Sequence, residues 1–175
     1  MSNLQLSKDF KLKEFAVSDS HPELAKLIIF DEIERWKLFY LAHMILQPVR
    51  DNFNQRMRIT SGKRSRELNS AIKGSSTSQH IFGEAADWVF ANNFQNSFRL
   101  PNAYEYIVER LQYNWHQVIL YLADDYRPRF IHVALPSLLT DKPNQAMLHY
   151  KGNYFLLDEN PNMLYNAKRY IHDRT

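Results

Sequence analysis

The first third of the chain carries apolar residues at helical spacing. Ser20-His21-Pro22-Glu23 has the form of a capping box, with serine as N-cap, proline in the first turn and glutamate three positions after the cap. The pattern predicts one long helix, or two joined helices, from this box to about residue 53, with Pro48 in a bend or a new first turn. The positions that carry the pattern are Leu24, Leu27, Ile28, Trp36, Phe39, Tyr40 and His43.

Strand patterns separated by turn residues dominate the middle of the chain. Two helices are predicted between the strands: RELNSAIK, with Ser65 as N-cap and Gly74 in the C′ position, and NAYEYIVERLQY at 102–113. The predicted strands are MRITSG (57–62), EAADWVF (84–90), HQVILYLA (116–123) and RFIHVAL (129–135), the last two joined by a hairpin DDYRPR, and NYFLLDENPN (153–162) indicates one more strand with a turn.

This order of elements predicts an α+β fold. We expect a small antiparallel sheet with helices packed on one side, the region Glu23–Phe53 lying on its back. One domain is expected for 175 residues. It divides into an N-terminal helical part of about 20–53, a core of about 57–135 that carries the candidate site, and a C-terminal extension of about 136–175.

Composition narrows the classes of function. A formal charge of +3 is too small to indicate a nucleic-acid partner by itself. There are no cysteines, so any metal must be held by His, Asp or Glu. The N-terminus has no secretory signal pattern, and no apolar run approaches the roughly 18 residues of a membrane span. We therefore expect a protein made in the cytoplasm, acting outside after lysis or as part of a larger particle.

The stretch from Ile59 to Asp87 holds three of the four glycines, Gly62, Gly74 and Gly83. Glycine is needed where the backbone turns sharply or approaches another group closely, so this stretch has the composition of a site. Within it, TSQHIFGEAADW places a histidine seven positions before an aspartate.

Strand parity adds a third side chain to this pair. In RFIHVAL, His132 shares a face with Phe130 and Ala134, so it can converge with His80 and Asp87 on one point. Catalytic zinc sites use three protein ligands of this kind and one open position. The alternative is that His80 is a loop histidine, Asp87 a cap at a strand start and His132 a hydrogen-bonded core residue.

The segment RITSGKRSRELNSAIKGSSTSQHIFGEAADW, followed by QVIL and IHV, closely resembles the zinc D-Ala-D-Ala carboxypeptidases. These peptidoglycan enzymes share a superfamily with lysostaphin and the sonic hedgehog signalling domain. The resemblance covers about Leu46 to Leu148, and it agrees in both spacing and glycines. It implies that His80, Asp87 and His132 bind Zn²⁺ and that the substrate is a cell-wall peptide ending in D-alanine.

The resemblance also suggests substrate contacts near these ligands. Arg64, in the SGKRS turn, corresponds to an arginine that holds substrate beside the metal; the alternative is a solvated basic turn. Ser78 and Gln79 flank the first ligand and are candidates for hydrogen bonds that orient it. Glu84 is interpreted as a surface residue. The remaining histidines have no partner pattern and are treated as ordinary: His21, His43, His116, His149 and His172.

The chain departs from the resembling enzymes at the general base. Those enzymes carry glutamate in a pattern like QLILE, whereas this chain reads QVILY and places Tyr121 there. A phenol has an ordinary pKa of about 10 and is a poor base near neutrality, although it can donate a hydrogen bond or ligate the metal. Asp124 or Asp125 in the following hairpin is a candidate replacement, although acids in hairpins are commonly plain turn residues.

Three functions therefore stay open. The first is a peptidoglycan peptidase with an altered base. The second is a structural or cell-wall-binding module that keeps the fold and zinc without the chemistry, as in a phage particle. The third is nucleic-acid binding through the basic residues Arg56, Arg58, Lys63, Arg64 and Arg66, which leaves the His-Asp-His pattern unexplained.

Overall fold

The computed structural model describes residues 3–91, 96–112, 114–136 and 144–172. The helices are α1 (Pro22–Ala25), α2 (Glu32–Leu41), α3 (Gln47–Phe53), α4 (Arg66–Ala71), α5 (Asn96–Arg110) and α6 (Pro161–His172), with 3-10 turns η1 (Leu12–Phe15) and η3 (Gln79–Phe82) and a π-helical turn η2 (Ala42–Leu46). The strands are β1 (Met57–Ser61), β2 (Ala85–Phe90), β3 (Gln117–Leu122), β4 (Pro128–Ala134), β5 (Gln145–Tyr150) and β6 (Asn153–Leu156).

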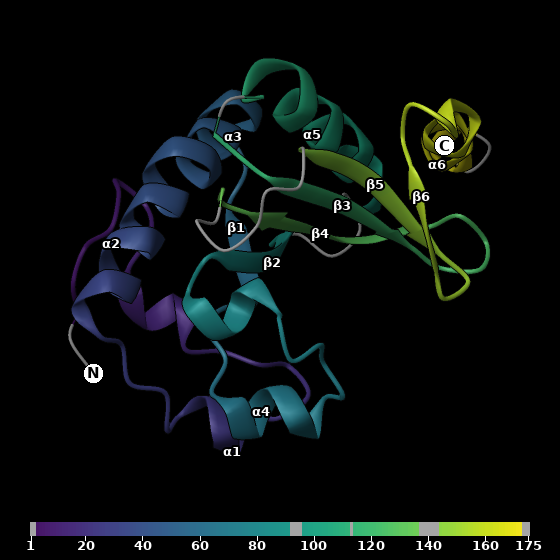
Figure 1. Ribbon diagram of the computed structural model, residues 1–175. Helices are drawn as coiled ribbons and strands as arrows, with labels where there is room; N and C mark the ends of the chain where they lie inside the picture. The colour runs from purple at the N-terminus through teal and green to yellow at the C-terminus, as the bar shows by residue number, and fades with distance from the viewer. Residues whose placement is uncertain (1–2, 92–95, 113, 137–143, 173–175) are drawn as a thin grey trace.

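One six-stranded sheet organises the molecule, and its strand order is β1-β2-β4-β3-β5-β6 (Figure 1). The α+β class is confirmed, as are the antiparallel β2–β4 and β3–β4 pairs and the hairpin between β3 and β4. The sheet is larger than expected and is mixed, because the chain after β4 returns to place β5 parallel to β3.

Helix α5 covers the back of the sheet, where it packs against β2, β3 and β4 (Figure 1). Trp88, Leu120 and Ile131 point to this side and are buried. The α2–η2–α3 region joins the same core through Leu38 and Ile45, and α3 also packs against α5. The opposite face of the sheet carries Asp87 and His132.

The N-terminal helical region differs from the prediction in where it begins. Helix α1 is one turn long and begins at Pro22, with His21 as N-cap and no side-chain capping bond, so Ser20 is not its cap. The long helix begins later, where Asp31 accepts a hydrogen bond from Glu34 N at 2.7 Å and Glu34 accepts one from Asp31 N at 3.1 Å. This second capping box is the one that works.

Residues 32–53 form one helical run that accommodates Pro48 through η2. Gln47 N–H donates to Ala42 O, five residues back, which is the π-helical spacing. A wider turn gives room for a proline ring that would otherwise meet the carbonyl of the preceding turn. The core face of the run is Leu38, Leu41 and Ile45, while Trp36 and Tyr40 are exposed.

Two further segments differ from the sequence prediction. Ser65 caps α4 as predicted, but the left-handed residue at its end is Lys73, and Gly74 follows one position later. Gly74 N donates to Asn69 O at 2.8 Å, and a Cβ at Gly74 would lie 2.3 Å from Asn69 Oδ1. Close approach rather than a positive φ therefore requires this glycine. The C-terminal extension also contains α6, which the sequence pattern does not predict.

Residues 3–19 pack into the fold beside β1. Leu6, Phe10 and Phe15 are buried in the core. Ser18 forms a β-bridge with Ser61. In the part of the chain that the structure describes, no helix has the length and apolar character needed to cross a membrane.

Candidate metal centre

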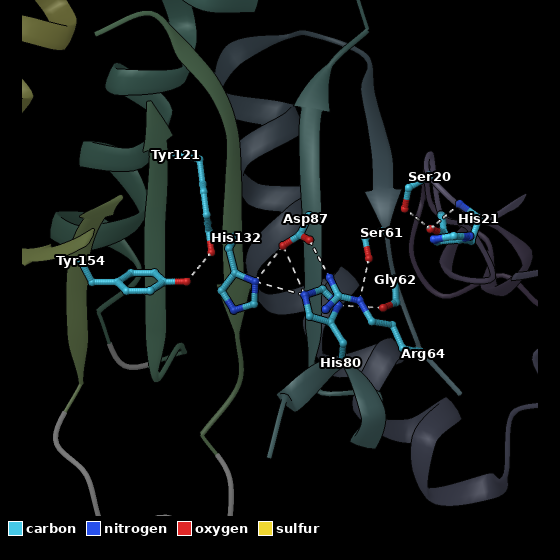
Figure 2. Close-up of polar contacts among 11 residues, drawn as sticks. Ser20, His21, Ser61, Gly62, Arg64, His80, Asp87, Tyr121, His132 and Tyr154 are labelled. Carbon is cyan, nitrogen blue, oxygen red and sulfur yellow. Dashed lines mark hydrogen bonds and ion pairs between the residues drawn. The ribbon is translucent and has the colours of Figure 1, made fainter. Parts of the chain in front are cut away.

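Three side chains meet on the face of the sheet opposite α5 (Figure 2). His80 comes from η3, while Asp87 and His132 are directly opposite each other on β2 and β4. His132 Nδ1 lies 2.7 Å from Asp87 Oδ1, and His80 Nε2 lies 3.2 Å from His132 Nδ1 and 3.3 Å from Asp87 Oδ1. All three residues are buried. The side chains singled out by strand parity and resemblance are therefore brought together.

The triangle of donor atoms has the size of a metal site. Ligands placed tetrahedrally at about 2.0–2.1 Å from an ion are roughly 3.3–3.4 Å apart. Two edges of the triangle already match this spacing, and the 2.7 Å edge is a hydrogen bond that an ion would replace. Two imidazoles and one carboxylate are a donor set suited to a divalent metal. The residues present thus fit a metal ion.

The backbone at Gly62 orients the first ligand. Gly62 O accepts a hydrogen bond from His80 Nδ1 at 2.7 Å (Figure 2). Because a carbonyl can only accept, the proton lies on Nδ1, and the lone pair of Nε2 points into the triangle. Gly62 N in turn donates to Val17 O at 3.3 Å, so the N-terminal segment positions the residue that orients His80.

Gly83 turns the chain from η3 into β2. Its φ of +65° lies in the left-handed region, which glycine adopts without a steric cost. Because the chain turns here, the side chains of His80 and Asp87 can point to the same place although only seven positions separate them. The concentration of glycines around the HIFGEAAD segment thus reflects backbone geometry at the site.

Replacing Gly62 by alanine is expected to weaken metal binding as well as folding. A Cβ there would lie 2.2 Å from Phe15 O, a backbone atom, so the loop must shift. We expect a loss of about 1–3 kcal/mol in the free energy of unfolding, as for other overpacked sites. We also expect a roughly 10- to 100-fold loss of metal affinity through the displaced His80 bond. Chemical denaturation and metal titration measure the two effects.

Gly152→Ala is the matched control for that variant. Gly152 has a positive φ of +80°, which Gly62 does not, but a Cβ at Gly152 meets nothing within 4 Å. It should cost about 1 kcal/mol from backbone strain and leave metal affinity unchanged. Equal metal affinity in Gly62→Ala and the parent would show that this peptide does not position His80.

Opposing effects set the protonation of the three candidate ligands. Burial lowers the pKa of His80 below its ordinary value, and the opposing influence of Asp87 does not reverse this. Burial alone would raise the pKa of Asp87, but the facing His80 and His132 outweigh it and lower that pKa well below its usual range. Both shifts favour the deprotonated forms, which are the forms that bind metals.

Arg64 lies against Asp87. Its guanidinium donates to Asp87 Oδ2 at 3.1 Å and to Ser61 Oγ at 3.0 Å, and its backbone N–H donates to His80 O at 3.0 Å (Figure 2). Burial lowers the pKa of Arg64, while Asp87 acts in the opposite direction. The arginine is therefore positioned at the centre, and its proposed contact with substrate stays a prediction.

Gln79 and Ser78 have different surroundings from those predicted. Gln79 Nε2 donates to Leu135 O at 2.9 Å, which ties η3 to the end of β4. Ser78 precedes η3, and its carbonyl accepts from Ile81 N at 3.0 Å. The His80 ring is oriented by Gly62 instead. Their predicted part in substrate binding stays a prediction.

Glu84 is buried, so the interpretation as a surface residue is wrong. Its side chain forms an ion pair with Lys37 of α2 at 2.7 Å. A second pair joins Lys63 to Glu34 of the same helix. Glu84 and Lys63 lie on either side of η3 in the sequence, so two ion pairs of opposite polarity attach α2 to the turn that carries His80. The sequence shows the acid but not the helix that faces it.

Lys37→Met is expected to lower the free energy of unfolding by about 1–3 kcal/mol. The change keeps most of the apolar stem but leaves the Glu84 carboxylate buried without its cation, which is the costly half of a broken pair. The expected loss is smaller than for a fully buried pair, because the Lys37 side chain is 33% exposed and solvent screens its charge. Urea denaturation measures the change, and adding Glu84→Gln should restore part of it.

Lys8→Met provides the comparison, because Lys8 pairs with Asp51 where both side chains are largely exposed. That variant should change stability by less than about 1 kcal/mol. If the two variants had equal effects, the buried pair would have no special role.

Tyr121 points to the same face as the candidate ligands. It is opposite Phe130 in the register, and the residue two positions before it, Ile119, is opposite His132. Burial, with a contribution from the Tyr154 hydroxyl, raises the pKa of Tyr121 above its ordinary value. A phenol with a raised pKa stays protonated near neutrality, which argues against a role as general base.

The candidate replacement bases lie in the exposed turn between β3 and β4. Asp125 accepts from Arg127 N at 3.2 Å, and the Asp124 carbonyl accepts from the Tyr150 hydroxyl at 3.0 Å. Asp124 is five residues beyond Ile119, or roughly 16 Å along an extended strand. This placement favours a turn role over a catalytic one.

A buried His-Asp-His group on the sheet of an α+β domain is consistent with a metallopeptidase-like protein. The chain belongs to the peptidase M15 family, because residues 9–114, more than half of its length, match the model of that family. This range includes His80 and Asp87 and ends before Tyr121 and His132. A comparison with curated proteins found no match.

Proposed function

We propose that this protein is a zinc-dependent peptidase of the cell wall, acting on peptidoglycan peptides near D-alanine. The observation that carries the proposal is the triangle of His80, Asp87 and His132, with Arg64 held 3.1 Å from Asp87. When bound there, zinc would supply Lewis acidity that activates a water molecule and polarises a peptide carbonyl.

The chain's own residues would supply binding and orientation. Gly62 keeps His80 in the tautomer that binds a metal, and Asp87 uses one oxygen for the triangle and the other for Arg64. The Arg64 guanidinium donates to Asp87 through one nitrogen and to Ser61 through another, and its remaining N–H groups would be available to a carbonyl or terminal carboxylate of the peptide. We propose this as its substrate role.

A second candidate function is a zinc-containing module without catalysis, binding the cell wall or residing in a phage particle. The observation that favours it is Tyr121, a protonated phenol at the position of the general base. The nucleic-acid alternative has less support, because three of the basic residues invoked for it are paired with acids: Arg58 with Asp19, Lys63 with Glu34 and Arg64 with Asp87.

Release of D-alanine from a cell-wall peptide by the zinc-loaded protein tests the proposal. Arg64→Ala is expected to weaken binding of a D-Ala-D-Ala peptide by about 10-fold or more, because a charge-assisted hydrogen bond is lost, and to leave zinc content unchanged when the protein is loaded at saturating zinc. Isothermal titration of zinc-loaded variants measures this. Arg58→Ala, which removes another paired arginine from β1, should bind as the parent does.

Parent protein that holds zinc and binds the peptide but releases no D-alanine would support the non-catalytic module instead. Unchanged binding in Arg64→Ala would return this residue to a structural role at Asp87.

A further inference from the structure

A row of aromatic rings crosses the sheet beside the metal centre. Phe130, Tyr121, His149 and Tyr154 come from the four neighbouring strands β4, β3, β5 and β6 and are opposite one another in register. Their ring centroids are 4.2 Å apart from Phe130 to Tyr121, 4.6 Å from Tyr121 to His149 and 4.8 Å from His149 to Tyr154. The sequence shows no partner for His149, and the structure places it inside this row.

The row ends in a pair of hydroxyl groups. Tyr121 Oη lies 3.1 Å from Tyr154 Oη, and Figure 2 shows the two rings reaching this contact from β3 and β6. Tyr121 is the diagonal neighbour of His132 across the β3–β4 pair, a separation of roughly 7–8 Å between Cα atoms that an aromatic side chain can cross. Tyr121 also interacts electrostatically with Asp87 and Arg64. The pair thus faces the metal centre.

A count of protons shows what the pair can offer. Each phenol carries one donor, and only one of the two protons is used in the bond between the hydroxyls. The second proton is available to a third atom. Because burial keeps Tyr121 neutral, this donor persists across the ordinary pH range.

We propose that Tyr121 and Tyr154 act as one unit, in which Tyr154 donates to the Tyr121 oxygen and Tyr121 donates to an oxygen of the peptide substrate at the metal centre. This inference rests on the proposed peptidase function. The acceptor is the carbonyl oxygen that gains negative charge as the peptide is hydrolysed, and a fixed donor aimed at such an oxygen stabilises that charge. Tyr121 is thus a donor where the resembling enzymes have a base.

Tyr154 is a positioning residue in this account. It lies on the edge strand β6 with 55% of its surface exposed, and its hydroxyl reaches the site only through Tyr121. Accepting a hydrogen bond from Tyr154 polarises the Tyr121 hydroxyl and makes it a stronger donor. Arg64 is hydrogen-bonded to Ser61 of β1, and the strands β2 and β4 separate β1 from β3. Arg64 and Tyr121 therefore approach the triangle of His80, Asp87 and His132 from opposite sides. The substrate would then be held from two sides.

Two peptide analogues test the unit by isothermal titration against zinc-loaded protein. The first is a phosphinic-acid analogue of a peptide ending in D-alanine, which carries anionic oxygens on a tetrahedral centre. The second has a reduced peptide bond and lacks the carbonyl oxygen. Tyr121→Phe is expected to weaken binding of the phosphinic analogue by about 10- to 100-fold, the range for a hydrogen bond to a charged acceptor. Its affinity for the reduced analogue should stay the same.

The positioning role of Tyr154 predicts a second set of affinities. Tyr154→Phe should weaken the phosphinic analogue by a smaller factor, about 3- to 10-fold, and the double variant should be no weaker than Tyr121→Phe alone. Tyr150→Phe is the matched control, because its hydroxyl bonds to Asp124 O in the hairpin turn. It should bind both analogues as the parent does.

Three results would overturn the inference. They are an unchanged affinity of Tyr121→Phe for the phosphinic analogue, an equal loss for both analogues, and losses that multiply in the double variant. In each case the parent still binds the analogue, so the proposed peptidase function survives. Zinc-loaded parent that binds neither analogue would remove the proposed function and this inference together.

Discussion

Metal binding is expected to fall by more than about 100-fold when His132 or His80 is replaced by alanine. Loss of a supporting hydrogen bond at a metal site typically costs 10- to 100-fold in affinity, and loss of a ligand should cost more. Each histidine supplies one corner of the triangle, and both face Asp87 Oδ1 within 3.3 Å. Elemental analysis and zinc titration of purified protein measure the loss.

Thermal unfolding gives an independent readout of the same prediction. Zinc at about 100 times its dissociation constant should stabilise the parent by about 2.7 kcal/mol, and this increment should vanish in the two alanine variants. His43→Ala is the control, because His43 is an exposed residue that stacks on Phe39. Alanine variants of His80 and His132 that hold as much zinc as the parent would remove the site.

Replacing Tyr121 by glutamate is expected to raise the hydrolysis rate by a large part of 10²- to 10⁴-fold, the usual contribution of a general base. The new carboxylate would take a proton from the attacking water and pass it to the leaving amine. It would remove the phenol donor proposed above, whose contribution is smaller, so the net effect is a gain. Glutamate is also smaller than the ring it replaces, which gives room for substrate beside Phe130 and His149.

The rate of D-alanine release in the parent and three variants decides this prediction. Asp124→Asn and Asp125→Asn should change little, because both residues lie in the exposed turn. If either lost a parent activity that Tyr121→Glu does not improve, that aspartate would be the base. Robust parent activity that survives both changes would contradict both accounts.

The candidate ligands could be predicted from the sequence because strand parity and local spacing fix their directions. Asp87 and His132 are on adjacent strands, and the alternation of side chains along each strand determines which face each takes. His80 lies in a 3-10 turn without such a period. Its place depends on Gly62 and Gly83, so the sequence indicates His80 only through its spacing from Asp87 and through the resemblance.

Other features depend on contacts far apart in the chain. Two capping boxes occur close together, and only the one at Asp31 leads into a helix that can bury Leu38 and Ile45. The apolar spacing through Trp36 and Tyr40 predicts a core face, yet these side chains are exposed. Local spacing reports helical periodicity but not which of two apolar faces meets the core.

The C-terminal part of the site could not be predicted from the sequence for a similar reason. The parallel pairing of β5 with β3 joins segments separated by the whole β3–β4 hairpin, and no turn motif signals such a pairing. Tyr154 and His149 reach Tyr121 only through this pairing and the β5–β6 hairpin. Likewise, Lys37 and Glu84 are 47 positions apart, so their ion pair could not be read locally.

The N-terminal segment affects whether a shortened form of this domain can bind metal. Phe15 O accepts from Lys63 N at 2.8 Å, and Val17 O accepts from Gly62 N at 3.3 Å, on either side of the peptide that orients His80. A proteolytic fragment starting near residue 20 would keep every candidate ligand and still bind metal poorly. Loss of the N-terminal residues by proteolysis during purification would therefore give the same weak zinc binding as an intrinsically weak site. Mass spectrometry of each titrated sample would distinguish these two causes.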